Sequence, residues 1–149
     1  CHDVYSQSRY AHFMALTFPF EKSLSPIFGT IHRPVAKVYF FSQAKKRWYE
    51  TWMIVDTGAD YTLLPKYFAA RLGVDLSKDC QVFRTAGIGG EENVYLLKKT
   101  KVKIGPWERD VPVGFLERDE IPPLLGRQLF LETFEVLFSS GHTLTFSSK

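Results

Sequence analysis

The feature that most constrains the fold is the segment 53–60, in which three apolar residues run directly into Asp56, Thr57 and Gly58. This pattern is typical of a buried strand that ends in a tight turn. A carboxylate there is costly unless it accepts hydrogen bonds, which the Thr57 hydroxyl and the Gly58 turn can donate. A carboxylate held in this way has a fixed orientation and is partly desolvated, so its pKa can be tuned for acid–base chemistry. An ordinary turn after a strand remains the alternative for this motif alone.

The length and charge of the chain limit what it can be. Its 149 residues predict a single domain, and 45% hydrophobic residues exclude wholesale disorder. Nineteen basic and 16 acidic residues leave a net charge of +3, too small to indicate a nucleic-acid partner. Apolar runs are all too short to span a membrane, so we expect no membrane partner.

The cysteines and histidines indicate no cofactor. The two cysteines form no disulfide framework, and although Cys1 could pair with Cys80, reduced thiols and a cytoplasmic protein are the simpler expectation. No histidines lie at a spacing typical of metal ligands, so we predict no metal site. They are His2, His12, His32 and His142.

Most of the chain from residue 33 onward is predicted to form strands. Apolar, β-prone residues at 35–41 and 48–55 flank a basic polar turn, which indicates a hairpin. Alternating residues at 101–104 and 111–115 predict a second, half-buried hairpin, whose lysines favour a solvated strand face over a DNA-binding patch. A last hairpin is predicted at 134–146.

Two short helices and an N-terminal arm complete the predicted organisation. The first helix is expected from Pro65 to Leu72, with Gly73 as its C-terminal cap, and the second at 126–134. Residues 1–32 are expected to form an arm before a domain at 33–149. Two alternatives stay open for residues 1–13. Either the natural protein starts at Met14 and these residues are an added, partly disordered extension, or they form an ordinary extended arm.

Three motifs in chain order carry a family resemblance: 54–60 (IVDTGAD), 87–90 (GIGG) and 124–127 (LLGR). Together they resemble the retropepsin-like aspartic proteases, the retroviral protease family and its stand-alone cellular relatives. Three ordered motifs are far more specific than one. The resemblance implies a mostly β fold, a single-domain closed β-barrel-like retropepsin fold with one or two short helices.

The resemblance also implies an aspartic endopeptidase acting on a peptide or protein substrate. Asp56 lies in the one D-T-G of the chain, so a full site requires two chains, and a C2 homodimer is expected. Two adjacent carboxylates would share a proton and titrate as a coupled pair. Water activation between them needs neither a metal nor a cofactor.

Residue roles follow from the same resemblance. Asp56, Thr57 and Gly58 match the catalytic triplet, in which the threonine hydrogen bonds across the dimer axis and the glycine lets the backbone approach substrate. Ala59 and Asp60 match residues beside the substrate main chain.

The flap and the supporting residues are carried over in the same way. Gly87, Ile88, Gly89 and Gly90 match the tip of a flap that closes over substrate. Gly126 and Arg127 match a supporting pair, with Arg127 forming a buried bidentate contact to Asp60. A surface arginine at a helix start is the alternative.

Some features depart from the retroviral pattern. Fifty-five residues precede Asp56, and a hairpin follows Arg127, which leaves the dimer geometry open. The flap glycines are followed by the polar residues Glu91, Glu92 and Asn93 where an apolar strand is expected. A catalytically silent peptide-binding or scaffold module on the same fold is the alternative function.

Overall fold

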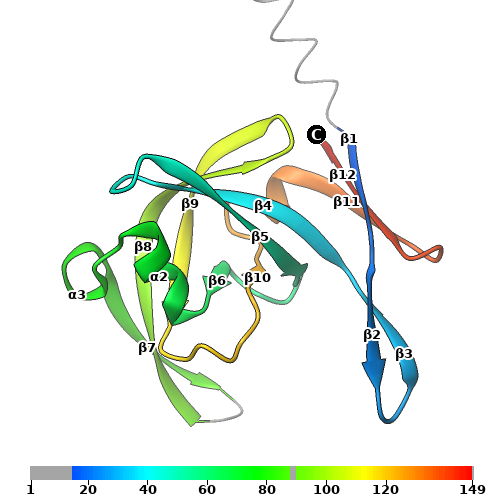
Figure 1. Ribbon diagram of the computed structural model, residues 1–149, viewed down its shortest axis with the longest axis horizontal. Coiled ribbons are helices and arrows are strands. Elements are labelled where there is room, and N and C mark those ends of the chain that lie inside the picture. The colour runs from blue at the N-terminus through cyan, green and yellow to red at the C-terminus, as the bar shows by residue number, and fades with distance from the viewer. Residues whose placement is uncertain (1–14, 88–89, 149) are drawn as a thin grey trace, which may run out of the picture.

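The computed structural model describes residues 15–87 and 90–148, which form two β-sheets, a separate hairpin and short helices (Figure 1). The strands are β1 (Ala15–Pro19), β2 (Glu21–Ser25), β3 (Gly29–Arg33), β4 (Val35–Ser42), β5 (Arg47–Val55), β6 (Thr62–Leu64), β7 (Gln81–Gly87), β8 (Gly90–Ile104), β9 (Trp107–Leu116), β10 (Leu124–Leu125), β11 (Phe134–Ser139) and β12 (Thr143–Ser148). The helices are α2 (Lys66–Leu72), α3 (Leu76–Asp79) and the 3-10 helix η1 (Leu131–Thr133).

The larger sheet closes on itself into a barrel. Its strand order is β4-β5-β10-β6-β9-β8-β7, and β4 also pairs with β8 through Tyr39–Lys103 and Phe40–Val102. Alternate residues of β4 point into the barrel, where Val38 and Phe40 are fully buried. Such closure leaves fewer open strand edges. The mostly β, closed-barrel fold expected from the sequence is confirmed.

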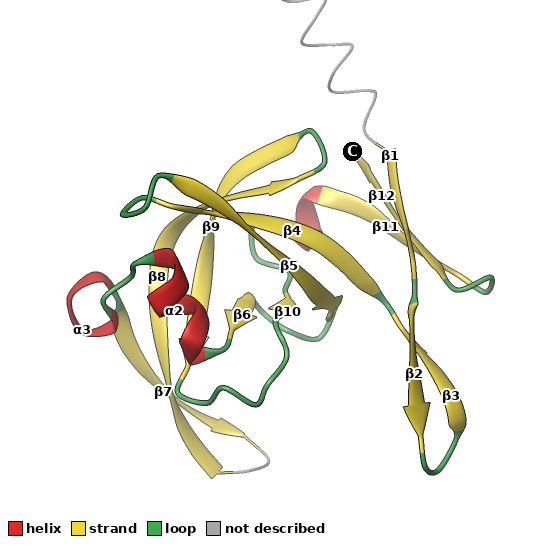
Figure 2. Ribbon diagram, viewed as in Figure 1, coloured by secondary structure: helices red, strands yellow, loops and turns green. Residues whose placement is uncertain are grey.

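A three-stranded sheet with the order β1-β12-β11 packs beside the barrel (Figure 2). Phe146 of β12 is fully buried and meets the rings of Phe18 and Phe134 edge-on, at centroid distances of 6.0 Å and 5.5 Å. Contacts of Phe18 with Trp52 of β5 and of Phe134 with Trp107 of β9, at centroid distances of 6.1 Å and 4.9 Å, join the two sheets into one core. The predicted last hairpin is confirmed as β11 and β12.

The helix expected at 65–72 is confirmed as α2, which buries Phe68 and Leu72 against the barrel. Gly73 ends it in the left-handed conformation, with φ +71°. The hairpins expected around 35–55 and 101–115 are confirmed as β4–β5 and β8–β9. Helix α3 was not anticipated, although the Asp75 side chain caps it by accepting from the amides of Ser77 and Lys78.

The helix expected at 126–134 is wrong in extent, since only η1 at Leu131–Thr133 is helical, after a series of turns. Leu129 has φ +56°, a left-handed conformation that interrupts a right-handed helix. Its amide donates instead to the Glu132 carboxylate at 3.0 Å. The backbone hydrogen bonds of the segment are those of successive turns, such as Phe130 to the Arg127 carbonyl and Leu131 to the Gly126 carbonyl, and not those of a continuous α-helix.

The predicted arm contains strands that its sequence did not indicate. Strand β1 pairs antiparallel with β12, from Ala15–Ser147 to Pro19–Thr143. Strands β2 and β3 pair only with each other in the described part of the chain, and their hairpin projects from the body in Figure 1. The boundary drawn at residue 33 stays a prediction, and residues before Ala15 lie outside the described residues.

Candidate active site

Strand β5 ends at Val55, and the next residue is Asp56, the acid of the D-T-G motif. The two-residue strand β10 lies parallel to the end of β5, pairing Leu124 with Ile54 and Leu125 with Val55. The Asp56 amide donates to the Leu125 carbonyl at 3.0 Å. The position of Asp56 is therefore fixed by a neighbouring strand from far along the chain.

The turn after Asp56 arranges its carboxylate. Asp56 Oδ1 accepts from the Gly58 amide at 3.0 Å, and the Asp56 carbonyl accepts from the Ala59 amide at 3.1 Å. Asp56 is half-buried, whereas Thr57 and Gly58 are exposed. A Cβ on Gly58 would lie 3.3 Å from Asp56 Oδ1, so glycine leaves the carboxylate unhindered. The hydrogen bond predicted for the carboxylate is confirmed with the Gly58 amide as its donor.

Arg127 holds the residues of this turn through hydrogen bonds. Its guanidinium donates to the Thr57 carbonyl and to Asp60 Oδ1, both at 2.6 Å. The Arg127 amide donates to the Ala59 carbonyl at 3.0 Å, and the Gln128 amide to the Asp60 carbonyl at 2.8 Å. Four hydrogen bonds from two consecutive residues thus hold the loop.

The predicted Arg127–Asp60 contact is present, but its expected burial is wrong in the single chain. The side chains are 44% and 80% exposed. The expected bidentate geometry also differs, because Arg127 divides its donors between Asp60 and the Thr57 carbonyl. An exposed ion pair contributes little to stability, so its effect is to fix the loop conformation.

Gly126 is required by a close backbone approach. A Cβ at this position would lie 2.3 Å from the carbonyl carbon and oxygen of Tyr61. The Gly126 amide donates to the buried Thr62 hydroxyl at 3.2 Å. The supporting role predicted for Gly126 therefore has a steric basis. Tyr61, Thr62 and Leu125 were missed as site-forming residues, because their contacts appear only once β10 is seen between β5 and β6.

The predicted flap corresponds to the end of the β7–β8 hairpin, where Gly87 pairs with Gly90. This end projects below the barrel in Figure 1, apart from the segment that joins β5 to β6. Ile88 and Gly89 lie outside the described residues. The sequence-predicted residues thus fall into two groups, the loop with its Gly126–Arg127 support and the hairpin end.

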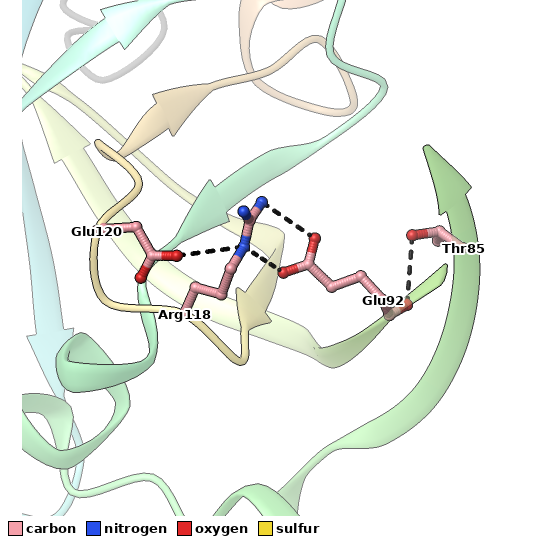
Figure 3. Close-up of polar contacts among 4 residues, drawn as sticks. All are labelled: Thr85, Glu92, Arg118 and Glu120. Carbon is pink, nitrogen blue, oxygen red and sulfur yellow. Dashed lines mark hydrogen bonds and ion pairs between the residues drawn. The ribbon is translucent and has the colours of Figure 1, made fainter. Parts of the chain in front are cut away.

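Ion pairs anchor the polar residues beside the flap glycines. Glu92 of β8 accepts from Arg118 Nε and Nη2 at 2.9 Å and 3.4 Å, and Arg118 Nε lies 3.8 Å from Glu120 (Figure 3). Glu91 pairs with Arg84 across the hairpin at 2.8 Å. The polar residues that depart from the retroviral pattern therefore connect the flap strands to each other and to the loop after β9.

A second polar cluster joins β8 to the same loop. The Glu117 carboxylate accepts from the Tyr95 hydroxyl at 2.6 Å and from the Asn93 amide at 3.2 Å. These hydrogen bonds, that of Tyr95 first, hold the pKa of Glu117 below its usual value. The same contact raises the pKa of Tyr95. Glu117 is thus kept ionised as an acceptor for the flap strand.

Within residues 15–87 and 90–148, no group of three or more His, Cys, Asp and Glu side chains is placed to hold a metal ion. No described helix has the length and apolar character needed to cross a membrane. Cys80 is a free thiol whose pKa is raised to about 11, chiefly by burial and then by Asp79 and Asp75. Its proposed partner, Cys1, lies outside the described residues.

Comparison with known proteins identifies a family and a similar fold. A family model for aspartyl proteases matches residues 47–129, more than half of the chain. The fold is similar to that of a retropepsin-like aspartic protease from Rickettsia conorii, with 21% sequence identity and a TM-score of 0.65. That match covers 89% of this chain and 98% of the other. No curated protein sequence matches significantly.

The family match spans the part of the chain that builds the site. It begins with β5 and continues beyond Arg127, so it includes the Asp56 loop, the flap hairpin and the Gly126–Arg127 support. The structural match independently places the same strands in a retropepsin-like fold. The chain therefore belongs to the aspartyl protease family, and its fold is retropepsin-like.

Proposed function

We propose that the chain is an aspartic endopeptidase whose active site is assembled from the Asp56 loops of two copies in a homodimer. The observation that carries the proposal is the Asp56 turn itself, in which the Gly58 amide orients a half-buried carboxylate and Arg127 holds the residues that follow it. One chain supplies one such carboxylate. Water activation by a carboxylate pair requires a second one, which a two-fold axis at the loop supplies.

The proposed reaction is hydrolysis of a peptide bond. The ionised Asp56 removes a proton from a water molecule, whose oxygen attacks the scissile carbonyl carbon. The protonated Asp56 of the second copy donates to the carbonyl oxygen, which becomes a hydroxyl of the tetrahedral intermediate. Collapse of the intermediate breaks the carbon–nitrogen bond, the nitrogen leaves with a proton from one carboxyl group, and a hydroxyl of the intermediate returns its proton to the other carboxylate as the new carbonyl forms. One proton is shared by the pair throughout.

The other site residues position substrate and carboxylates. Arg127 is proposed as a positioning residue, since its contacts go to Thr57 and Asp60 rather than to Asp56. The glycines at 87–90 are proposed to let the flap approach the peptide backbone and exclude water when it closes.

The test is cleavage of a peptide library, from acid to neutral pH, by the wild type and by Asp56→Asn. We expect the substitution to reduce cleavage by roughly 1,000-fold or more, because a neutral amide cannot act as general base. Asp110→Asn, at an exposed aspartate on β9, is the matched control and should cleave like the wild type. Sedimentation of each sample confirms that it is dimeric.

Retained cleavage in Asp56→Asn would contradict the proposed role of this carboxylate. A wild-type dimer that binds library peptides without cleaving them would instead support the alternative, a silent peptide-binding or scaffold module. Binding that survives Asp56→Asn would strengthen that alternative, because a binding module does not need the acid.

A further inference from the structure

The tip of the β2–β3 hairpin exposes more apolar surface than a hairpin turn normally does. Leu24, Ile27 and Phe28 are 88%, 81% and 77% exposed. Turn positions usually carry small or polar residues, and scattered single hydrophobic residues need no explanation. Three large neighbouring ones on a projecting hairpin form an apolar tip that indicates an interaction surface. We call this hairpin, Glu21–Arg33, the arm.

The tip has a defined conformation of its own. The Ser25 hydroxyl accepts from the amides of Ile27 and Phe28, both at 3.2 Å. Gly29 adopts φ +76°, which closes the turn. Regular pairing continues from Ser25–Gly29 down to Glu21–Arg33. The apolar side chains are therefore presented on a pre-organised turn, which lowers the entropic cost of binding.

The base of the arm lies at the active-site end of β5. Pro34, directly after the arm, accepts from the Val55 amide at 2.9 Å, one residue before Asp56. On the other side, His32 stacks on His142 of the β11–β12 turn, with ring centroids 3.8 Å apart. From this anchored base the arm extends away from the barrel (Figure 1). Its direction is therefore set from beside the half-site.

We infer that the arm is a dimerisation element whose apolar tip packs on the body of a second copy of this chain. The inference rests on the proposed function, because the half-site at Asp56 is incomplete without that copy. A second chain that brings its own Asp56 to this loop must lie beside the base of the arm. A two-stranded hairpin is marginally stable alone, so burial of its tip on the partner also stabilises the arm itself. Two-fold symmetry doubles the contact, since each copy contributes one arm.

The first experiment measures dimerisation by sedimentation equilibrium, independently of cleavage. The tip variant Leu24→Ser/Ile27→Ser/Phe28→Ser should weaken dimerisation by at least about 100-fold, because it removes six apolar side chains from the symmetric interface. The control is Tyr67→Ser, which removes an exposed aromatic ring on helix α2 and should leave dimerisation unchanged. Far-ultraviolet circular dichroism confirms that both variants are folded.

The second experiment identifies what the tip touches. Phe28 is replaced by the photoreactive residue p-benzoylphenylalanine, and chains with and without ¹⁵N labelling are mixed before irradiation. We expect cross-linked peptides that join a labelled chain to an unlabelled one. Cross-links confined to peptides of equal label would overturn the inference, as would a tip variant that dimerises like the wild type.

The two proposals fail in different ways. A wild type that forms tip-dependent dimers but cleaves nothing would support the arm and contradict the endopeptidase. A wild type that cleaves peptides as a dimer, together with a tip variant that dimerises equally well, would support the endopeptidase and contradict the arm. If the tip variant keeps its dimer but loses flotation with phosphatidylcholine vesicles, the tip binds lipid and the arm does not hold a second copy.

Discussion

Gly126 has little freedom to change because it lies against the backbone of another loop. The carbonyl of Tyr61 occupies the space in which a Cβ would lie, at 2.3 Å. Any side chain would separate β10 from the loop between Asp56 and β6. Since the Leu125 carbonyl is the acceptor for the Asp56 amide, a shift at Gly126 also disturbs the turn at Asp56.

Gly126→Ala should therefore lower the free energy of unfolding by about 1–3 kcal/mol, the usual effect of overpacking. Gly141→Ala is the matched control, because its added Cβ would meet only the Ser139 hydroxyl at 3.4 Å. Gly141→Ala should change the free energy of unfolding by no more than about 0.5 kcal/mol. Urea unfolding at one fixed protein concentration measures both. Equal losses in the two variants would show that the Tyr61 contact is relieved at little cost.

At the scale of elements, the β7–β8 hairpin, the proposed flap, is connected to the body through polar contacts on β8. Glu117 follows β9 and receives hydrogen bonds from Tyr95 and Asn93 of β8. Because these contacts lower the pKa of Glu117, they contribute stability that is fully present above its unfolded pKa of 4.5. That contribution is lost as the pH falls through the lower pKa of the folded state.

Tyr95→Phe should raise the pKa of Glu117 toward 4.5, because it removes the largest cause of the shift. Carboxyl-carbon NMR titration measures this pKa directly. Tyr39→Phe is the control, since the Tyr39 hydroxyl donates to Glu50 on the barrel instead, and the Glu117 titration should not change. An unaltered Glu117 titration in Tyr95→Phe would refute the proposed origin of the shift.

The strongly periodic elements could be predicted from the sequence, and the short ones could not. The alternation predicted at 101–104 is observed in β8, where Val102 and Ile104 are buried and the lysines beside them are half-buried, and Gly73 ends α2 as expected. Strand β10 has only two residues and no periodicity, so its place between β5 and β6 depends on long-range pairing. In the site, the motif pattern located Asp56 and Arg127. The exposure of the Arg127–Asp60 pair, and the fact that Arg127 donates to both Thr57 and Asp60, depend on packing that no local pattern encodes.

For the whole molecule, the main consequence of the proposed mechanism is that activity belongs to a pair of chains. A mixed dimer of wild type with Asp56→Asn has one ionisable carboxylate at its centre and cannot share a proton between two. With a tenfold excess of Asp56→Asn and free exchange of subunits, cleavage per wild-type chain should fall to roughly a tenth. An unrelated protein at the same concentration is the control. Undiminished cleavage would show that each chain acts alone.

The contacts of Arg127 also bear on the order in which the molecule can be made. Its guanidinium bonds to residues 70 and 67 positions earlier, at Thr57 and Asp60. Synthesis proceeds from the N-terminus, so these residues leave the ribosome long before their partner. The acid loop stays unsupported until translation has passed Arg127. On the proposed function, a nascent or interrupted chain therefore has a supported acid loop only after Arg127 has been made.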